Sequence, residues 1–154
     1  MKRSRDPSLL SINPKRIPLD EAYMEMAETW AKRSKANRLQ VGAIIVKDNQ
    51  IISDGYNGMP TGSSNDVCEF YDDEGNLATY PEVLHAESNA LMKICRHGGL
   101  GTAGATLYCT DAACEHCAKL IIQAQIKRFV YRRPYRLTTG LDLLRLYKIQ
   151  VDQL

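Results

Sequence analysis

Two short segments carry the side chains that bind metal ions and move protons. Residues 85–87 have the sequence His-Ala-Glu, and residues 114–117 have the sequence Cys-Glu-His-Cys. One imidazole and two thiolates are ligands that Zn²⁺ takes in proteins. Structural zinc is closed by four protein ligands, whereas catalytic zinc has three and an open fourth position. The segments together predict a catalytic zinc site with His85, Cys114 and Cys117 as ligands.

Glu87 is expected to act beside the metal without binding it. On a regular helix a residue two positions from His85 does not share its direction, but at the first turn it can reach the open position. Two thiolates cancel the charge of Zn²⁺, so a water there is acidified less than in an all-histidine site, where its pKa is about 7. A nearby carboxylate must then accept the proton, so we predict that Glu87 is the catalytic proton shuttle.

Each segment alone has a simpler explanation. A Cys-x-x-Cys pair occurs in redox proteins and as half of a four-cysteine zinc site, and His-x-Glu arises often by chance. The other cysteines form no second such pair, and the two segments begin successive predicted helices joined by one strand. The combination favours the catalytic site. The cysteines and histidines not expected to bind the metal are Cys68, Cys95, Cys109, His97 and His116.

The predicted elements alternate in a way that positions both segments. Asp20 is expected to cap a helix that runs to about Lys35. Its predicted buried face consists of Tyr23, Met26, Ala27, Trp30 and Ala31. Later helices are expected at 85–97, 114–125 and 141–147, and strands at 41–46, 51–56, 105–110, 126–131 and 149–152. Residues 57–84 are expected to be a long functional loop. This order predicts an α/β fold, a mixed sheet with helices on both faces.

Composition narrows the class of protein. The chain has 154 residues and a net charge of +2, which gives no argument for binding nucleic acid. Five cysteines and no signal peptide argue against disulfides, and no stretch approaches membrane-spanning length. We expect a cytoplasmic protein with an N-terminal arm at 1–18 and one domain at 19–154.

These segments resemble the zinc nucleobase deaminases, whose pattern is His-x-Glu followed by Pro-Cys-x-x-Cys. Within them the chain is similar to the deoxycytidylate (dCMP) deaminase branch, including viral members, for which the host cytoplasm is the expected location. Four segments carry the resemblance, at 41–46, 55–62, 85–90 and 114–124, and 55–62 (Gly-Tyr-Asn-Gly-Met-Pro-Thr-Gly) is specific to that branch.

The resemblance implies a fold and a role for individual residues. It implies a three-layer α/β/α arrangement around a five-stranded sheet, and conversion of dCMP to dUMP and ammonia, which supplies dUMP for thymidylate synthesis. It matches His85, Cys114 and Cys117 to the zinc ligands and Glu87 to the proton shuttle. It further implies that Asn57 contacts the sugar and that Tyr135 meets the 5′-phosphate. No histidine precedes His85, so we expect one zinc per chain.

The resemblance also implies regulation. The resemblance to this branch implies that the chain forms a homo-hexamer, which dCTP with Mg²⁺ activates and dTTP inhibits. Arg96 matches a position tied to that regulation, and Lys32, Asn37 and Arg38 lie where the regulatory nucleotide is expected.

Two positions depart from the family pattern. Ala113 replaces the proline before the first cysteine, which would pre-set φ for entry into the helix. Gln125 replaces the glycine that usually ends the second helix, and a left-handed conformation there costs about 1–2 kcal/mol for a residue with a Cβ.

Two alternatives remain at this stage. The arginines at 132, 133 and 136, with their neighbouring tyrosines, suit a polynucleotide backbone, so a tRNA or single-stranded DNA deaminase is the first. The second is a non-catalytic member that keeps zinc only for folding.

Overall fold

A computed structural model describes residues 16–154, and its centre is one five-stranded sheet. The expected arm at 1–18 lies mostly outside these residues. The strand order is β2 (Gln50–Tyr56), β1 (Gly42–Lys47), β5 (Thr106–Asp111), β6 (Arg128–Arg133) and β7 (Gln150–Gln153). β1 is antiparallel to both neighbours, whereas β5, β6 and β7 run parallel. The predicted mixed sheet is confirmed.

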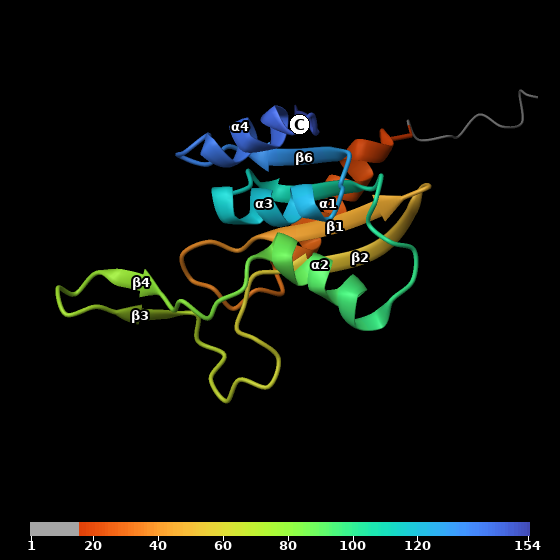
Figure 1. Ribbon diagram of the computed structural model, residues 1–154. Coiled ribbons are helices and arrows are strands. Elements are labelled where there is room, and N and C mark those ends of the chain that lie inside the picture. The colour runs from red at the N-terminus through yellow and green to blue at the C-terminus, as the bar shows by residue number, and fades with distance from the viewer. Residues whose placement is uncertain (1–15) are drawn as a thin grey trace, which may run out of the picture.

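Helices cover both faces of this sheet, as the three-layer prediction requires (Figure 1). α1 (Leu19–Ala31) packs on one face against β1 and β5. The other face carries α2 (Ala86–His97), α3 (Glu115–Gln123) and α4 (Thr139–Leu146). Alternate strand residues supply the two cores, since Ile44 and Val46 lie in the cluster under α1 and Ala43 and Ile45 in the cluster on the opposite face.

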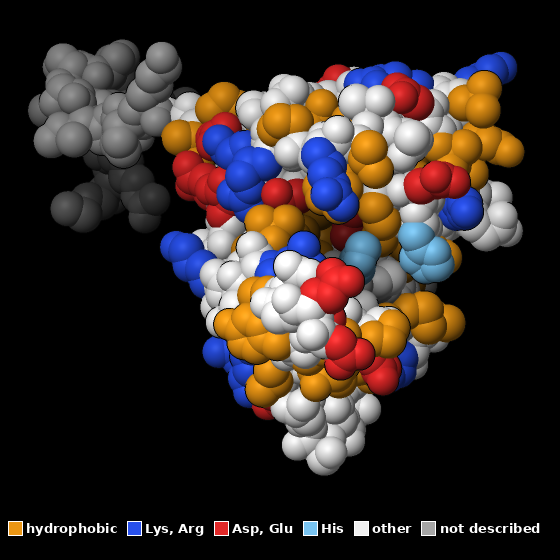
Figure 2. Space-filling model, turned by 90° about the vertical axis from the view of Figure 1, so that its left-hand side faces the viewer, with side chains coloured by type: hydrophobic (Ala, Val, Ile, Leu, Met, Phe, Trp, Pro, Cys, Tyr) orange, Lys and Arg blue, Asp and Glu red, His pale blue; other side chains and the backbone are white. Residues whose placement is uncertain are grey.

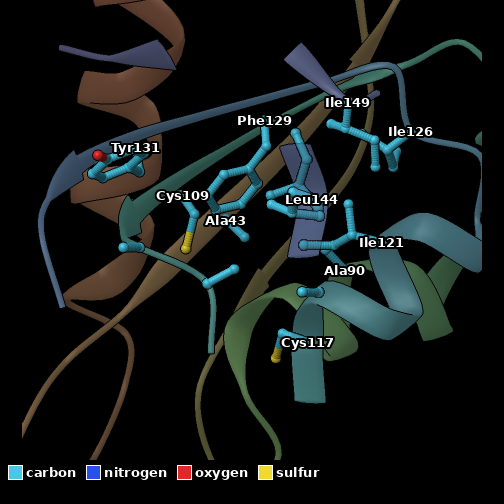
Figure 3. Packing of buried hydrophobic residues seen from close by; sticks show 14 of the residues in the cluster. Ala43, Ala90, Cys109, Cys117, Ile121, Ile126, Phe129, Tyr131, Leu144 and Ile149 are labelled. Carbon is cyan, nitrogen blue, oxygen red and sulfur yellow. The ribbon is translucent and has the colours of Figure 1, made fainter. Parts of the chain in front are cut away.

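The larger core lies under α2 and α3, the helices that begin at the His-Ala-Glu segment and at the cysteine pair. Phe129 of β6 is fully buried and lies among Ala43, Cys109 and Leu144 (Figure 3). Cys117 belongs to the same cluster at the start of α3. The second cysteine of the pair is therefore held by the packed core.

The first helix differs from its prediction in both end and face. It ends at Ala31 and not near Lys35, and Asp20 lies inside its first turn, where its carboxylate accepts hydrogen bonds from Arg128 and Tyr108. Met24 is fully buried, whereas Met26 and Trp30 are 45% and 37% exposed. The predicted burial of Met26 and Trp30 is therefore wrong. Apolar residues occur on more than one side of this helix, so their spacing alone does not show which side packs on the sheet.

The expected loop at 57–84 contains a small hairpin that the sequence analysis missed. β3 (Glu69–Tyr71) pairs with β4 (Leu77–Thr79), and this two-stranded arm projects from the end of the sheet near the start of α2 (Figure 1). Its turn is closed by Asp72, whose carboxylate accepts from the backbone of Glu74 and Asn76. Each strand has three residues, too few to show a period in the sequence.

Among the described residues, no helix is both long enough and apolar enough to cross a membrane.

Candidate active site

Three predicted metal ligands meet where α2 and α3 begin. His85 precedes the first residue of α2, Cys114 precedes that of α3, and Cys117 lies one turn further on. The Nδ1 atom of His85 is 3.5 Å from Sγ of Cys114 and 3.3 Å from Sγ of Cys117. Tetrahedral Zn²⁺ with its usual bond lengths places nitrogen and sulfur ligands about 3.5 Å apart. The spacing and the donor set fit Zn²⁺.

The local charges favour a metal cation at this point. The backbone N–H of Cys117 points at Sγ of Cys114 over 3.4 Å, as expected for a thiolate at a helix N-terminus. A hydrogen bond from the Cys117 thiol holds the pKa of Cys114 well below its usual range, and the same bond together with burial raises the pKa of Cys117. Cysteines bind a metal ion as thiolates, so a cation held between these two sulfurs would displace protons from them.

Glu87 lies in the first turn of α2, 4% exposed, and lines the pocket beside His85. Burial raises the pKa of this carboxyl to about 7. A carboxyl with that pKa exchanges protons readily near neutral pH. Its carboxylate is not part of the cluster of three donors.

A pocket of about 280 Å³ opens above these groups. Figure 2 looks onto the end of the molecule from which the β3–β4 hairpin projects, and histidine side chains lie there beside a hollow. Asn57 and Tyr135, the two predicted substrate contacts, both line the pocket. The Asn57 amide also holds the loop before β1, because Oδ1 accepts from Val41 N over 2.9 Å and Nδ2 donates to Leu39 O over 2.8 Å. One donor and one acceptor of that amide remain for a ligand.

The pocket wall also contains polar residues that the sequence analysis did not assign to it. They are Arg38, Glu69, Thr79 and Asp111. Arg38 was expected at a regulatory site, and the other three had no predicted role. Glu69 and Thr79 belong to the hairpin that the sequence analysis missed, so no pattern placed them near His85.

The arginines after β5 are mostly paired with carboxylates. Arg133 binds Asp111 through two nitrogens, over 3.1 Å and 3.0 Å. Arg132 lies 2.5 Å from Glu21 and 3.1 Å from Glu28. Arg136 stacks over the Tyr135 ring at 5.9 Å. The pairing removes two of the three cations from the cluster that was expected to suit a polynucleotide backbone.

The expected regulatory residues fall into two places. Lys32, Asn37 and Arg38 line a second hollow, of about 490 Å³, together with Arg133. Arg96 lies in the last turn of α2, where its Nε is 3.1 Å from Nε2 of His97. Arg96 is not among the residues that line the second hollow.

The remaining cysteines and histidines lie apart from the metal site. Cys68 and Cys109 are buried and Cys95 is exposed, and all three are free thiols. His97 and His116 are exposed. Within residues 16–154, the only group of three or more His, Cys, Asp or Glu donors that could hold a metal is the predicted one.

Two glycines bring the helices close enough to form the site, and neither was singled out from the sequence. A Cβ on Gly55 of β2 would lie 2.3 Å from Ala86 O at the start of α2. A Cβ on Gly140 of α4 would lie 2.0 Å from Ala113 O, next to the first cysteine. Real Cβ atoms do not approach backbone oxygen so closely, so only glycine fits at either position.

A family model described as the cytidine and deoxycytidylate deaminase zinc-binding region matches residues 18–133. This range includes the strands β1, β2, β5 and β6, the His-Ala-Glu segment and the cysteine pair. The chain belongs to the cytidine and deoxycytidylate deaminase family. The predicted resemblance is thereby confirmed, together with the fold and the class of metal that the family binds.

Individual members of this family are similar over most of the chain. Deoxycytidylate deaminase from Homo sapiens is 44% identical over 114 residues, which are 72% of this chain and 62% of that protein. The chain therefore covers less than two thirds of that relative. Deoxycytidylate deaminase of Mycobacterium phage D29 is 36% identical over 73% of this chain and 92% of its own length. A dCMP deaminase from the cyanophage S-TIM5, solved in complex with dCMP and dUMP, matches with a TM-score of 0.82, 38% identity, 93% of this chain and 99% of its own.

Proposed function

We propose that this chain is a zinc-dependent hydrolytic deaminase that converts dCMP and water into dUMP and ammonia. The observation that carries the proposal is a buried carboxylate, Glu87, beside three donors that fit Zn²⁺, in a pocket that Tyr135 also lines. The cyanophage relative was solved with dCMP and dUMP, which supports this substrate.

The chemistry assigned to the chain's own residues is proton transfer and positioning. Zinc held by His85, Cys114 and Cys117 would act as a Lewis acid and supply an activated water as nucleophile. Glu87 takes a proton from the water that attacks C4 of the base and passes it to N3. Glu87 then takes the remaining proton of the hydroxyl group on C4 and delivers it to the 4-amino group, so that the C4–N bond breaks, ammonia departs and C4 becomes a carbonyl. Asn57 contacts the sugar and Tyr135 contacts the 5′-phosphate.

A turnover assay across five substrates tests this proposal. Zinc-loaded protein is given dCMP, CMP, dCTP, cytidine and a cytosine-containing oligonucleotide, and ammonia release is measured. We expect dCMP to be deaminated with the highest kcat/KM. Absence of ammonia from dCMP would favour a family member that keeps zinc only for folding, and preference for the oligonucleotide would favour a polynucleotide deaminase.

The polynucleotide alternative has little support from the charges. Binding a nucleic-acid backbone requires several free cations, and each one adds to the salt dependence. Arg132 and Arg133 are both engaged by carboxylates. We therefore keep a free nucleotide as the proposed substrate.

The regulatory part of the proposal rests on the family resemblance and on the second hollow. We propose that a homo-hexamer is activated by dCTP with Mg²⁺ and inhibited by dTTP, with Lys32, Asn37 and Arg38 near the nucleotide and Arg96 taking part in the response. Repeating the dCMP assay with each nucleotide, with and without Mg²⁺, tests it. A rate that neither nucleotide changes would contradict it.

A further inference from the structure

The loop that carries Cys114 lacks the proline that the family pattern has before the first cysteine. Only Ala112 and Ala113 separate the end of β5 from Cys114, and Ala113 occupies the proline position. A proline would fix φ there and reduce the number of conformations open to the loop. Alanine provides no such restraint, so the position of Cys114 depends on other contacts.

A buried carboxylate at the end of β5 restrains the loop in another way. Asp111 is the last residue of β5, and its side chain is 11% exposed. Its Oδ1 accepts from Nε of Arg133 over 3.1 Å, and its Oδ2 accepts from Nη2 of Arg133 over 3.0 Å and from the hydroxyl of Thr110 over 2.7 Å. A carboxylate bound by two nitrogens of one guanidinium has a fixed orientation. These three hydrogen bonds therefore fix the point at which the loop leaves the strand.

The main chain of the loop is attached to the strands on both sides of β5. The backbone N–H of Ala112 donates to the carbonyl oxygen of Arg133 over 2.9 Å, so Arg133 holds the loop through its backbone as well as its side chain. On the other side, Oγ1 of the fully buried Thr110 accepts from the backbone N–H of Gly42 in β1 over 3.2 Å. Asp111 therefore joins β1, β5 and β6 just before the first cysteine.

The backbone of Ala113 itself takes no part in these contacts. In the part of the chain that the structure describes, its N–H donates no hydrogen bond to another backbone group. Proline has no N–H, so a proline at this position would remove no backbone hydrogen bond. The chain therefore offers a variant that restores the family restraint and leaves the contacts of Asp111 in place.

We propose that the ion pair of Asp111 with Arg133 positions the proposed zinc ligand Cys114, and that it replaces the restraint of the family's proline. Asp111 lines the pocket but is not one of the three clustered donors, and its oxygens already accept from three groups. It is a positioning residue that acts through the loop. The inference rests on the proposed function, because it concerns the zinc site of the proposed deaminase.

The proposal predicts that the ion pair and a proline can substitute for each other. With the pair intact, Ala113→Pro restrains a loop that is already fixed. With the pair broken, the loop must be ordered when zinc binds, and Ala113→Pro removes part of that entropy cost in advance. The effect of Ala113→Pro on zinc affinity therefore depends on Asp111, and a double-mutant cycle measures this dependence.

The experiment measures the zinc Kd of each variant by competition with a chelator, with circular dichroism as the check on folding. We expect Asp111→Asn and Arg133→Gln each to raise the zinc Kd by about 10-fold, as for other residues that orient metal ligands. Ala113→Pro should lower the Kd of Asp111→Asn by about 3-fold and that of the wild type by no more than about 1.5-fold. Asp152→Asn is the matched control, because Asp152 pairs with Arg128 at the other end of β6, and its zinc Kd should equal that of the wild type.

Kinetics at saturating zinc separate positioning of the loop from contact with the substrate. In Asp111→Asn the kcat for dCMP should fall and should recover when Ala113→Pro is added, because both changes act on the position of Cys114. The KM for dCMP should stay within about 2-fold of the wild-type value. A direct contact of Asp111 with the substrate predicts instead a raised KM, an unchanged zinc Kd and no recovery with proline.

Two results would overturn the inference. One is a folded Asp111→Asn variant that binds zinc as tightly as the wild type, and the other is an equal effect of Ala113→Pro with and without Asp111. If Asp111→Asn does not fold, Arg133→Gln with and without Ala113→Pro gives the same cycle. A wild type that binds zinc but releases no ammonia from dCMP would contradict the proposed function alone, since the zinc Kd values still decide this inference.

Discussion

At the scale of single residues, the position of Glu87 predicts a function separable from metal binding. Its carboxylate is buried beside His85 but is not one of the three clustered donors. Glu87→Gln should therefore keep one zinc per chain and lose about 10²–10⁴-fold in kcat, the usual contribution of a general acid–base group. Elemental analysis and the dCMP assay measure the two quantities. Glu115→Gln is the control, because that exposed glutamate pairs with Lys119 and should keep both properties.

The raised pKa of Glu87 predicts a pH dependence of stability in the metal-free protein. Burial raises this pKa from 4.5 to about 7, so between those values the folded state holds a proton that the unfolded state has released. The resulting stabilisation is complete below pH 4.5 and is lost as the pH rises through 7. The free energy of unfolding should fall by about 3 kcal/mol over this interval.

Chemical denaturation in the presence of a chelator, at several pH values, measures that loss. Glu87→Gln removes only this titration, so its stability should depend less on pH than that of the wild type, and the difference isolates the carboxyl from His85 and the cysteines. Parallel pH profiles for the two proteins would show that burial does not raise the pKa of Glu87.

At the scale of elements, the helices and strands that could be predicted from the sequence are those long enough to show an apolar run or a helical spacing. The hairpin of β1 and β2 was predicted from two apolar runs around Asp48 and Asn49, which take φ of 50° and 59° as a tight turn requires. The starts of α2 and α3 were predicted from the proposed zinc ligands His85 and Cys114, each followed by residues with helical spacing. The β3–β4 hairpin was missed because its pairing depends on side-chain contacts between distant segments, such as that of Glu69 with Asn37.

The same difference between short sequence patterns and contacts made only in the fold explains which pocket residues could be predicted. His85, Cys114, Cys117 and Glu87 could be predicted because few residue types bind zinc and their spacing is short. The placement of Arg38 could not, because it depends on which arginines the fold pairs with carboxylates. The burial of Met24 in place of Met26 has a similar cause, since only the packing of α1 on β1 decides which apolar side of the helix is covered.

Close packing of α4 against the cysteine loop predicts the effect of one added methyl group. Gly140→Ala would place a Cβ 2.0 Å from Ala113 O, so either α4 or the loop with Cys114 must move. We expect the free energy of unfolding to fall by about 2 kcal/mol and zinc to bind more weakly. Thermal denaturation and zinc titration check this. Gly101→Ala is the control because its Cβ meets nothing within 4 Å, and equal behaviour of the two variants would contradict the packing argument.

The end of α3 predicts a stabilising substitution. Gln125 has φ of 57°, and the N–H groups of Gln125 and Ile126 donate to Ile122 O and Ile121 O, the pattern of a Schellman motif. Gln125→Gly should raise the free energy of unfolding by about 0.5–1 kcal/mol, because it relieves the left-handed strain but adds chain entropy to the unfolded state. Gln123→Gly, at the last residue of α3, should have the opposite sign. Equal destabilisation in both would show that Gln125 is not strained.

At the scale of the whole molecule, the metal site contacts the hydrophobic core, but the core does not depend on the metal. The cores on the two sheet faces consist mainly of side chains that touch no metal, and Cys117 is the one proposed ligand in the larger cluster. The metal-free protein should therefore stay folded, unlike a small zinc finger, whose fold depends on the ion. Zinc should add stability by binding the folded state, by about 4 kcal/mol at a concentration 1,000 times its Kd.

Thermal denaturation with and without a chelator, together with zinc counts, tests this link and the identity of the ligands in one set of variants. Removing zinc should lower the Tm of the wild type by about 10 °C, given about 2–4 °C per kcal/mol for a chain of this size. Cys114→Ser should hold no zinc and show no further loss with the chelator. Cys95→Ser, at an exposed position, should retain the full difference, and Cys68→Ala and Cys109→Ala should melt lower because both are buried, yet keep one zinc per chain. Loss of zinc from any of these last three variants, with the fold intact, would mean that the ion lies elsewhere than between His85, Cys114 and Cys117.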